Sequence, residues 1–277
     1  MRLRSIVVAL VGIVLLCGQA PIADFETVKI PPAREGWPTL TGYWRAPAGA
    51  TAGRVPVVVA LHGCGGNLTP KGEMVRRDRD WADRLVSWGY AVLFLDSFNP
   101  RGFRQICTLK AFERRVRPAD RAIDVQAALV WLTSKAGVDL SRIALLGWSN
   151  GGSTVLRAVG QATGPVPSHV KTAVAFYPGC GAILPRAKWR PHVPLSILIG
   201  SDDNWTPAER CRTLAARHPG IHFVEYPEAV HGFDAPNSKP RVLKGLGLVG
   251  EAKIGTNPKA RAAAIDEVQR LLKEAFR

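Results

Sequence analysis

The sequence predicts an α/β fold with a mostly parallel central sheet and helices on both faces. The first observation is a series of continuous apolar runs, which are typical of strands covered on both sides. These runs are Val55–Leu61, Tyr90–Leu95, Val170–Tyr177 and Leu195–Ile199. The second is that segments with helical spacing separate the runs, which favours parallel strands. The third is size, because 277 residues that are 47% hydrophobic can bury one large core.

The first third of the chain supplies three strands and one helix. Residues 21–38 are rich in proline and are expected to form an extended lead-in. The alternation over Leu40–Ala46 predicts an antiparallel strand. After the buried strand Val55–Leu61, residues 70–88 carry Trp81, Leu85 and Trp88 at helical spacing. The strand Tyr90–Leu95 follows this predicted helix.

Strands and helices continue to alternate over the rest of the chain. Residues 103–117 are irregular and basic, and Pro118 then begins a helix that extends to about Ala136. Its expected core face holds Ile123, Ala127, Val130 and Trp131. The remaining predicted elements are the strand 143–146, a helix from 151, the strands 170–177, 195–199 and 221–226, and the helices 207–217 and 259–276. No internal repeat is visible, so residues 21–277 are predicted to form a single domain.

The N-terminus has the pattern of a signal peptide. Arg2 and Arg4 precede an apolar run over Ile6–Leu16, and small residues follow at 18–20. The run is too short to span a membrane comfortably, so we expect residues 1–20 to be removed and no stable membrane anchor to remain. Cys17 is a weak lipidation candidate because Leu16 stands where a small residue should. The predicted location is the periplasm or the exterior.

Export would bring the chain into an oxidising compartment, where four cysteines would remain after cleavage. Four cysteines allow three pairings, and free buried thiols are the alternative. Cys64 and Cys107 lie in loops at one edge of the predicted sheet, and Cys180 and Cys211 follow adjacent strands. We therefore expect the disulfides Cys64–Cys107 and Cys180–Cys211.

The formal net charge of +15 would suit an anionic partner such as nucleic acid or a membrane surface. The basic residues are scattered, however, and form no long run. We therefore expect a solvated basic surface, no nucleic-acid partner and a monomer.

A nucleophile motif lies between the strand 143–146 and the next helix. Residues 147–151 read Gly-Trp-Ser-Asn-Gly, the G-x-S-x-G pattern of a sharp strand-to-helix turn that exposes Ser149. His231, in a loop after the last predicted strand, is the candidate base. Asp203, after the strand 195–199, is the candidate acid that orients it. The expected oxyanion donors are the backbone amides of Asn150 and Cys64, the latter in a glycine-rich loop.

Four segments together resemble an α/β-hydrolase of the dienelactone hydrolase family. They are residues 61–66 (Leu-His-Gly-Cys-Gly-Gly), the elbow 147–152, the acid loop 200–207, and His231-Gly232-Phe233. The resemblance covers roughly residues 40–275. It implies the α/β-hydrolase fold, an eight-stranded type of sheet without a large lid, and cleavage of esters or lactones with no metal or cofactor. The family's G-x-x-D spacing before a proline, here Pro207, selects Asp203 over Asp202, whereas Asp234 and Glu228 are weaker alternatives.

Two departures from the namesake enzymes affect the expected substrate. Those enzymes use a cysteine nucleophile, whereas this chain has Ser149. They also hold a substrate carboxylate with two arginines, of which Arg101 could match the first while the second has no counterpart after His231. The sequence therefore favours a serine carboxylesterase acting on a small-molecule ester or lactone, with Arg101 as a candidate substrate-binding residue. The alternatives are a peptidase of the prolyl oligopeptidase type and a non-catalytic binding protein that kept the fold.

Overall fold

The computed structural model describes residues 24–50, 54–161 and 165–277, and the expected leader 1–20 lies outside them. Eight strands form one sheet in the order β1-β2-β4-β3-β5-β6-β7-β8. The strands β1 (Glu26–Ile30) and β2 (Leu40–Arg45) are antiparallel to their neighbours. The other six are parallel to one another, so the predicted mostly parallel sheet is confirmed.

The six parallel strands carry the buried apolar runs. In each of β3, β4, β6 and β7 nearly every residue is buried, because helices cover both faces. The parallel strands, in sheet order, are β4 (Ala91–Asp96), β3 (Val55–Leu61), β5 (Val138–Trp148), β6 (Val170–Phe176), β7 (Leu195–Gly200) and β8 (Ile221–Tyr226).

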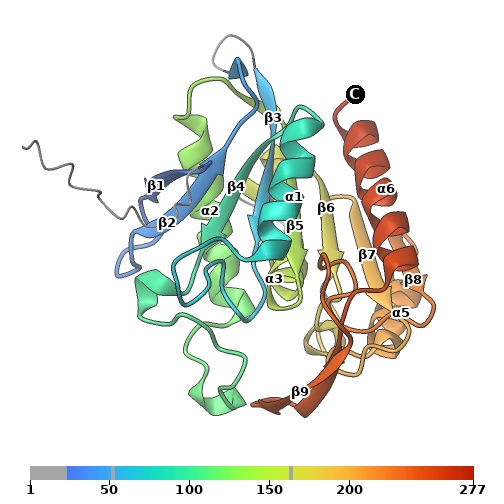
Figure 1. The fold of residues 1–277 in the computed structure, drawn as a ribbon. Helices are drawn as coiled ribbons and strands as arrows, with labels where there is room; N and C mark the ends of the chain where they lie inside the picture. Colours follow the sequence, from blue (N-terminus) through green and yellow to red (C-terminus); the bar gives the residue numbers. More distant parts are fainter. Residues whose placement is uncertain (1–23, 51–53, 162–164) are drawn as a thin grey trace, which may run out of the picture.

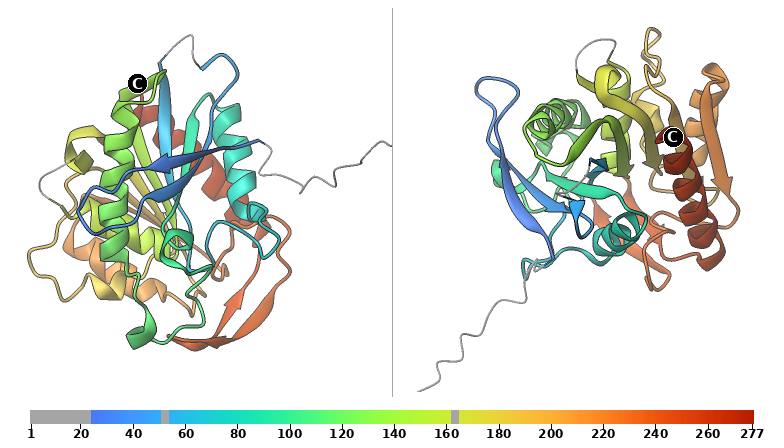
Figure 2. Two further views of the ribbon diagram at one scale, coloured as in Figure 1. Left: turned by 90° about the vertical axis from the view of Figure 1, so that its left-hand side faces the viewer. Right: turned by 90° about the horizontal axis from the view of Figure 1, so that it is seen from above.

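Helices form the two outer layers. The helices α1 (Arg76–Ser87) and α6 (Pro258–Ala275) cover one face, and α2 (Pro118–Thr133) and α3 (Asn150–Val159) cover the other (Figures 1 and 2). The short α4 (Pro165–His169) lies between α3 and β6, and α5 (Ala208–Arg217) connects β7 to β8. Because the strands share one direction, the loops after β3 to β8 gather at one edge of the sheet, which we call the carboxyl edge.

The fold differs from the sequence predictions in several places. The helix α4 was not predicted, and β5 begins at Val138 rather than at residue 143. Residues 21–38 contain the strand β1, which pairs with β2, rather than only an extended lead-in. Beyond His231 the chain forms an unpredicted hairpin of β9 (Arg241–Leu246) and β10 (Gly250–Ile254). Val130, expected in the core, is 55% exposed, because the buried face of α2 is formed by Ala122, Val125 and Leu129 instead.

Both expected disulfides are present, which confirms the predicted pairing. Cys64 is bonded to Cys107, and Cys180 is bonded to Cys211. The first bond joins the loop after β3 to the segment between β4 and α2, and the second joins the loop after β6 to α5. Within the described ranges no helix is long and apolar enough to cross a membrane.

Candidate active site at the carboxyl edge

Ser149 occupies a strained turn between β5 and α3. Its φ of 53° and ψ of −112° lie outside the regions that non-glycine residues usually adopt, a conformation that carries about 1–3 kcal/mol of strain. The turn is held on both sides, because the Ser149 amide donates to the Phe176 carbonyl at 2.9 Å and the Ser149 carbonyl accepts from the Ser153 amide at 2.8 Å. Such a turn directs the side chain out over the sheet edge, and Ser149 is partly exposed there.

The glycines of the motif are required by close backbone contacts. A Cβ on Gly151 would overlap the Leu61 carbonyl, and a Cβ on Gly147 would overlap the Gly151 carbonyl. Any larger residue at these two positions would push α3 away from β3 and β5. The pattern therefore reflects the packing of the turn as well as its chemistry.

His231 and Asp203 form a buried pair. The His231 Nδ1 atom lies 2.7 Å from the Asp203 carboxylate, and the two residues are 5% and 3% exposed. Asp203 also accepts hydrogen bonds from the backbone amides of Trp205 and Thr206 and from the Thr206 hydroxyl. A carboxylate held in this way fixes the imidazole proton on Nδ1 and leaves Nε2 free as a base.

Two aromatic rings hold the imidazole of His231 from its sides. The ring of Tyr177 lies 4.5 Å and the ring of Trp205 lies 4.7 Å from the imidazole, measured between centroids. Tyr177 follows β6 and has a φ of 36°, so its backbone is also unusual. The Ser149 hydroxyl makes no hydrogen bond to His231 within the described residues. In enzymes without bound substrate such contacts are often long.

The glycine-rich loop after β3 lies against the elbow. A Cβ placed on Gly63 would be 3.6 Å from the Ser149 Cβ and 3.5 Å from the Trp148 carbonyl. Asn150 is the first residue of α3, where backbone amides have no acceptor within the helix. The Cys64 amide follows Gly63, and the disulfide to Cys107 anchors this loop. Both amides expected to form the oxyanion hole therefore lie close to Ser149 along the chain or in space.

Arg121 links the glycine-rich loop to the elbow, a contact that sequence reasoning missed. Its Nη1 atom donates to the His62 carbonyl at 2.9 Å and to the Asn150 side-chain oxygen at 2.6 Å. The guanidinium is fully buried beside the Phe98 ring, and burial lowers the pKa of Arg121 to about 10. It is therefore charged at neutral pH, and holds together the two segments that carry Cys64 and Asn150.

Asp234 is buried below the site and has a structural role. It accepts hydrogen bonds from the indole nitrogens of Trp81 and Trp148 at 2.8 and 2.9 Å and from the Tyr177 hydroxyl at 2.5 Å. Burial, and then the charge of Asp234, raise the pKa of Tyr177 well above its usual value. The Asp234 carboxylate is thus bound to Trp81, Trp148 and Tyr177 rather than to the His231 imidazole. Glu228 is exposed. Neither alternative acid contacts His231 within the described structure.

The two neighbouring acids after β7 are in different environments. Asp203 points inward to His231, whereas the exposed Asp202 accepts a hydrogen bond from the Ser201 hydroxyl at 2.7 Å. Thr206, which sequence reasoning did not single out, donates to Asp203 and lies 3.2 Å from His231 Nδ1. Of the two neighbouring aspartates, Asp203 is therefore the one that contacts the His231 imidazole.

Arg101 is engaged within the protein. Its guanidinium forms a bidentate pair with Asp124 at 2.7 and 2.9 Å and donates to the Ser97 carbonyl at 2.7 Å. Both Nη atoms of Arg101, which would bind a substrate carboxylate, therefore already have partners within the protein. Arg77 lies at the elbow, with its guanidinium 5.0 Å from the centre of the Trp148 ring, and is paired with Asp78.

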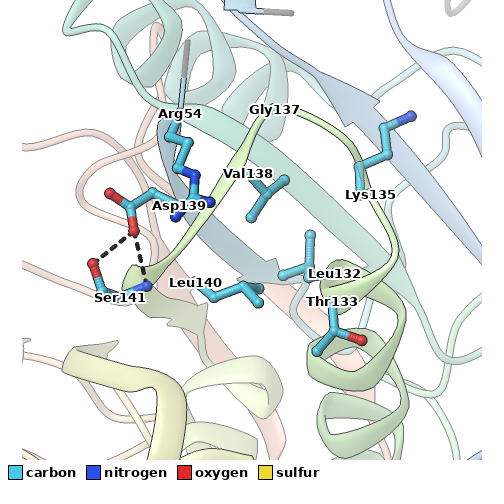
Figure 3. A pocket seen from close by; sticks show the side chains of 9 residues that line it. All are labelled: Arg54, Leu132, Thr133, Lys135, Gly137, Val138, Asp139, Leu140 and Ser141. Carbon is cyan, nitrogen blue, oxygen red and sulfur yellow. Dashed lines mark hydrogen bonds between the residues drawn. The ribbon is translucent and has the colours of Figure 1, made fainter.

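A cavity of about 490 Å³ lies at the opposite, amino edge of the sheet. Arg54, Val138, Asp139 and Ser141 contribute to its lining (Figure 3). Asp139 accepts hydrogen bonds from the amide and the hydroxyl of Ser141, and no histidine or cysteine is among the described residues that line the cavity. Among the residues that the structure describes, no group of three or more His, Cys, Asp or Glu could hold a metal ion.

A comparison with protein families identifies a family for this chain. The family model for the dienelactone hydrolase family matches residues 40–276. A comparison with curated protein sequences found no match.

Three solved structures illustrate the similarity of fold. A candidate dienelactone hydrolase from Klebsiella pneumoniae subsp. pneumoniae has a TM-score of 0.67 at 19% identity, covering 90% of this chain and 98% of its own. A dienelactone hydrolase from Anabaena variabilis has a TM-score of 0.64 at 19% identity, with coverages of 91% and 98%. A thermophilic esterase from Thermogutta terrifontis, solved with butyrate bound, has a TM-score of 0.60 at 19% identity, with coverages of 91% and 95%.

The family match spans almost all of the described chain, and the fold is that of the structures compared. The chain therefore belongs to the dienelactone hydrolase family, has the α/β-hydrolase fold and is a carboxylic ester hydrolase.

Proposed function

We propose that the protein is an exported, monomeric serine hydrolase of small carboxylic esters or lactones, with Ser149, His231 and Asp203 as its triad. The observation that carries the proposal is the buried His231–Asp203 pair, which lies at the same sheet edge as the strained Ser149. No cofactor enters this chemistry.

In the acylation step, the Ser149 hydroxyl attacks the ester carbonyl while His231 Nε2 takes its proton. Asp203 accepts the Nδ1 proton in a hydrogen bond and stabilises the imidazolium that forms. The carbonyl oxygen becomes an oxyanion, to which the Asn150 and Cys64 amides donate. Collapse of this intermediate breaks the ester bond, and the alcohol leaves with the proton from His231.

In the deacylation step, His231 takes a proton from water, which attacks the acyl group on Ser149. The second tetrahedral intermediate uses the same amides. Its collapse breaks the bond between the acyl carbon and Ser149 Oγ, which takes the proton back from His231 as the acid is released. Tyr177 and Trp205, which flank the imidazole, keep it oriented through both steps. The proposal leaves Arg101 out of the substrate site because Asp124 already neutralises it.

The direct test is turnover of p-nitrophenyl butyrate by the wild type and by Ser149→Ala. Loss of the nucleophile should lower kcat by about 10⁴-fold or more while the thermal unfolding curve is kept. A variant with half of the wild-type rate would exclude Ser149 as the nucleophile. A parallel panel of chromogenic peptides separates an esterase from a prolyl oligopeptidase-like peptidase, and no turnover of either would favour a binding protein.

Export is part of the same proposal and is supported by the two disulfides. Mass spectrometry of the protein recovered from the periplasm or medium should find an N-terminus near residue 20. Recovery of an intact N-terminus, with Met1 or Arg2 as its first residue, would contradict this.

A further inference from the structure

The exposed large apolar side chains are concentrated in two segments of the chain. Five are strongly exposed within the described residues, and four of these belong to two segments, 103–117 and 239–254. They are Phe112 at 81%, Val242 at 48%, Leu248 at 52% and Val249 at 41%. The fifth is Val130 on α2. Scattered exposure of single apolar residues is ordinary, whereas concentration on two segments is not.

The two segments form one surface, which we call the apolar rim. The Gly247 amide donates to the Cys107 carbonyl at 3.1 Å, and a Cβ on Gly247 would overlap the Leu109 carbonyl. The tip of the β9–β10 hairpin therefore rests directly on the 107–109 backbone. Figures 1 and 2 show the hairpin and this segment side by side in separate views. Phe112 and Leu248 project from turns near this contact.

The apolar rim borders the active site. Ile254, at the end of β10, forms a parallel bridge with His231, and the Lys253 amide donates to the Asn204 side chain at 2.8 Å. On the other side, the disulfide from Cys107 leads to Cys64 in the proposed oxyanion loop. Material bound at the rim would therefore lie beside the entrance to Ser149.

Basic side chains surround the apolar ones. Residues 103–117 contain five Lys or Arg and one acid, Glu113. Residues 239–254 contain four Lys or Arg and one acid, Glu251. Lys110 lies two residues from Phe112, and Lys244 shares a strand face with Val242 because side chains alternate along β9. Both lysines are exposed.

We propose that the apolar rim docks the protein on an anionic lipid surface. Projecting apolar side chains enter the boundary between headgroups and acyl chains, while the surrounding lysines and arginines bind the anionic headgroups. A second copy of the chain is a poorer occupant, because a symmetric contact would bring two strongly basic surfaces together. Docking presents the entrance of the active site to esters dissolved in the lipid phase.

The test is sedimentation with vesicles of phosphatidylcholine alone and of phosphatidylcholine with phosphatidylglycerol. We expect binding to the anionic vesicles, weak binding to the neutral ones, and loss of binding when salt is raised well above about 0.1 M. The double variant Phe112→Ser/Leu248→Ser should lower partitioning by about tenfold or more. The control Val130→Ser, whose side chain on α2 is 55% exposed against 52% for Leu248, should bind as the wild type does.

Lys110→Gln/Lys244→Gln provides a second variant, which should reduce binding to anionic vesicles without removing apolar surface. These surface variants carry the same N-terminus as the wild type and should hydrolyse a water-soluble ester at the wild-type rate. Ser149→Ala should bind vesicles normally, so docking is measured independently of the proposed triad. Equal binding to both vesicle types, an equal loss in Val130→Ser, or a change of molecular mass in the double variant by light scattering would overturn the proposal.

Discussion

The two edges of the central sheet both carry polar side chains, but the side chains have different partners at the two edges. At the amino edge, the Asp139 carboxylate accepts hydrogen bonds from Ser141 and Arg142. It lies beside an open cavity (Figure 3). At the carboxyl edge, the Asp203 carboxylate is buried and its partner is an imidazole. Strained backbone occurs there as well, at Ser149 and Tyr177.

The difference favours the carboxyl edge over the polar cavity as the place of the proposed catalysis. A hydrogen bond from the Ser141 hydroxyl is the main reason that the pKa of Asp139 falls to about 2, so this acid is a stable anion with no base to orient. Asp203 instead fixes the tautomer of His231, which leaves one imidazole nitrogen available. The carboxyl edge is also where open α/β sheets bind ligands.

Of the substitutions at the two edges, that of Asp203 in the acid loop should have the largest effect. Asp203→Asn should lower kcat by about 10³–10⁴-fold, because the amide no longer holds the reactive tautomer of His231. Asp202→Asn, the neighbouring control, changes only an exposed carboxylate bonded to Ser201 and should have a far smaller effect. Steady-state ester hydrolysis measures both. A larger loss in Asp202→Asn would contradict the assignment.

Arg121 should have the next largest effect, through the position of the oxyanion amides. Arg121→Lys keeps the charge but cannot reach the His62 carbonyl and the Asn150 side chain with the same geometry. We expect kcat to fall by about 10–100-fold with little change in KM. Arg117→Lys, an exposed position in the residue before α2, is the control. If kcat is unchanged, or if only KM changes, Arg121 does not position the oxyanion amides.

The smallest effect is expected at the amino edge. Asp139→Ala should leave kcat within about twofold, since surface changes away from the site usually have small effects. The folded-state pKa of Asp139 lies below its usual value, so its contribution to stability is present at neutral pH and is lost as the pH falls toward 2. Wild type and variant should therefore differ in thermal midpoint at pH 7 and converge near pH 2. A strong loss of kcat would mean that this cavity takes part in catalysis.

Much of the fold and the candidate triad could be predicted because each depends on local patterns. The buried strands appear as apolar runs, and Ser149 is marked by the glycines that its turn requires. Asp203 is preferred to Asp202 because of the resemblance to the family's acid loop, in which a proline, here Pro207, follows the acid by four residues. The disulfide pairs followed from the order of strands, which places each pair of loops at one edge.

Contacts between distant segments could not be predicted in the same way. The pairing of Arg101 with Asp124 and the reach of Arg121 to Asn150 depend on how α2 packs against the sheet. The hairpin β9–β10 is short, charged and rich in glycine, so its sequence resembles a loop. Val130 lies at the boundary of the apolar stripe on α2, where a small rotation of the helix decides exposure.

The most direct test of the central claim is covalent labelling of the nucleophile. A fluorophosphonate should inactivate the esterase with one adduct per chain, and peptide mass spectrometry should locate that adduct on Ser149. The Ser149→Ala variant should remain unlabelled, and His231→Ala should react much more slowly because no base takes the serine proton. An adduct on another residue would contradict the account. So would treated protein that keeps its full ester turnover and carries no adduct on Ser149.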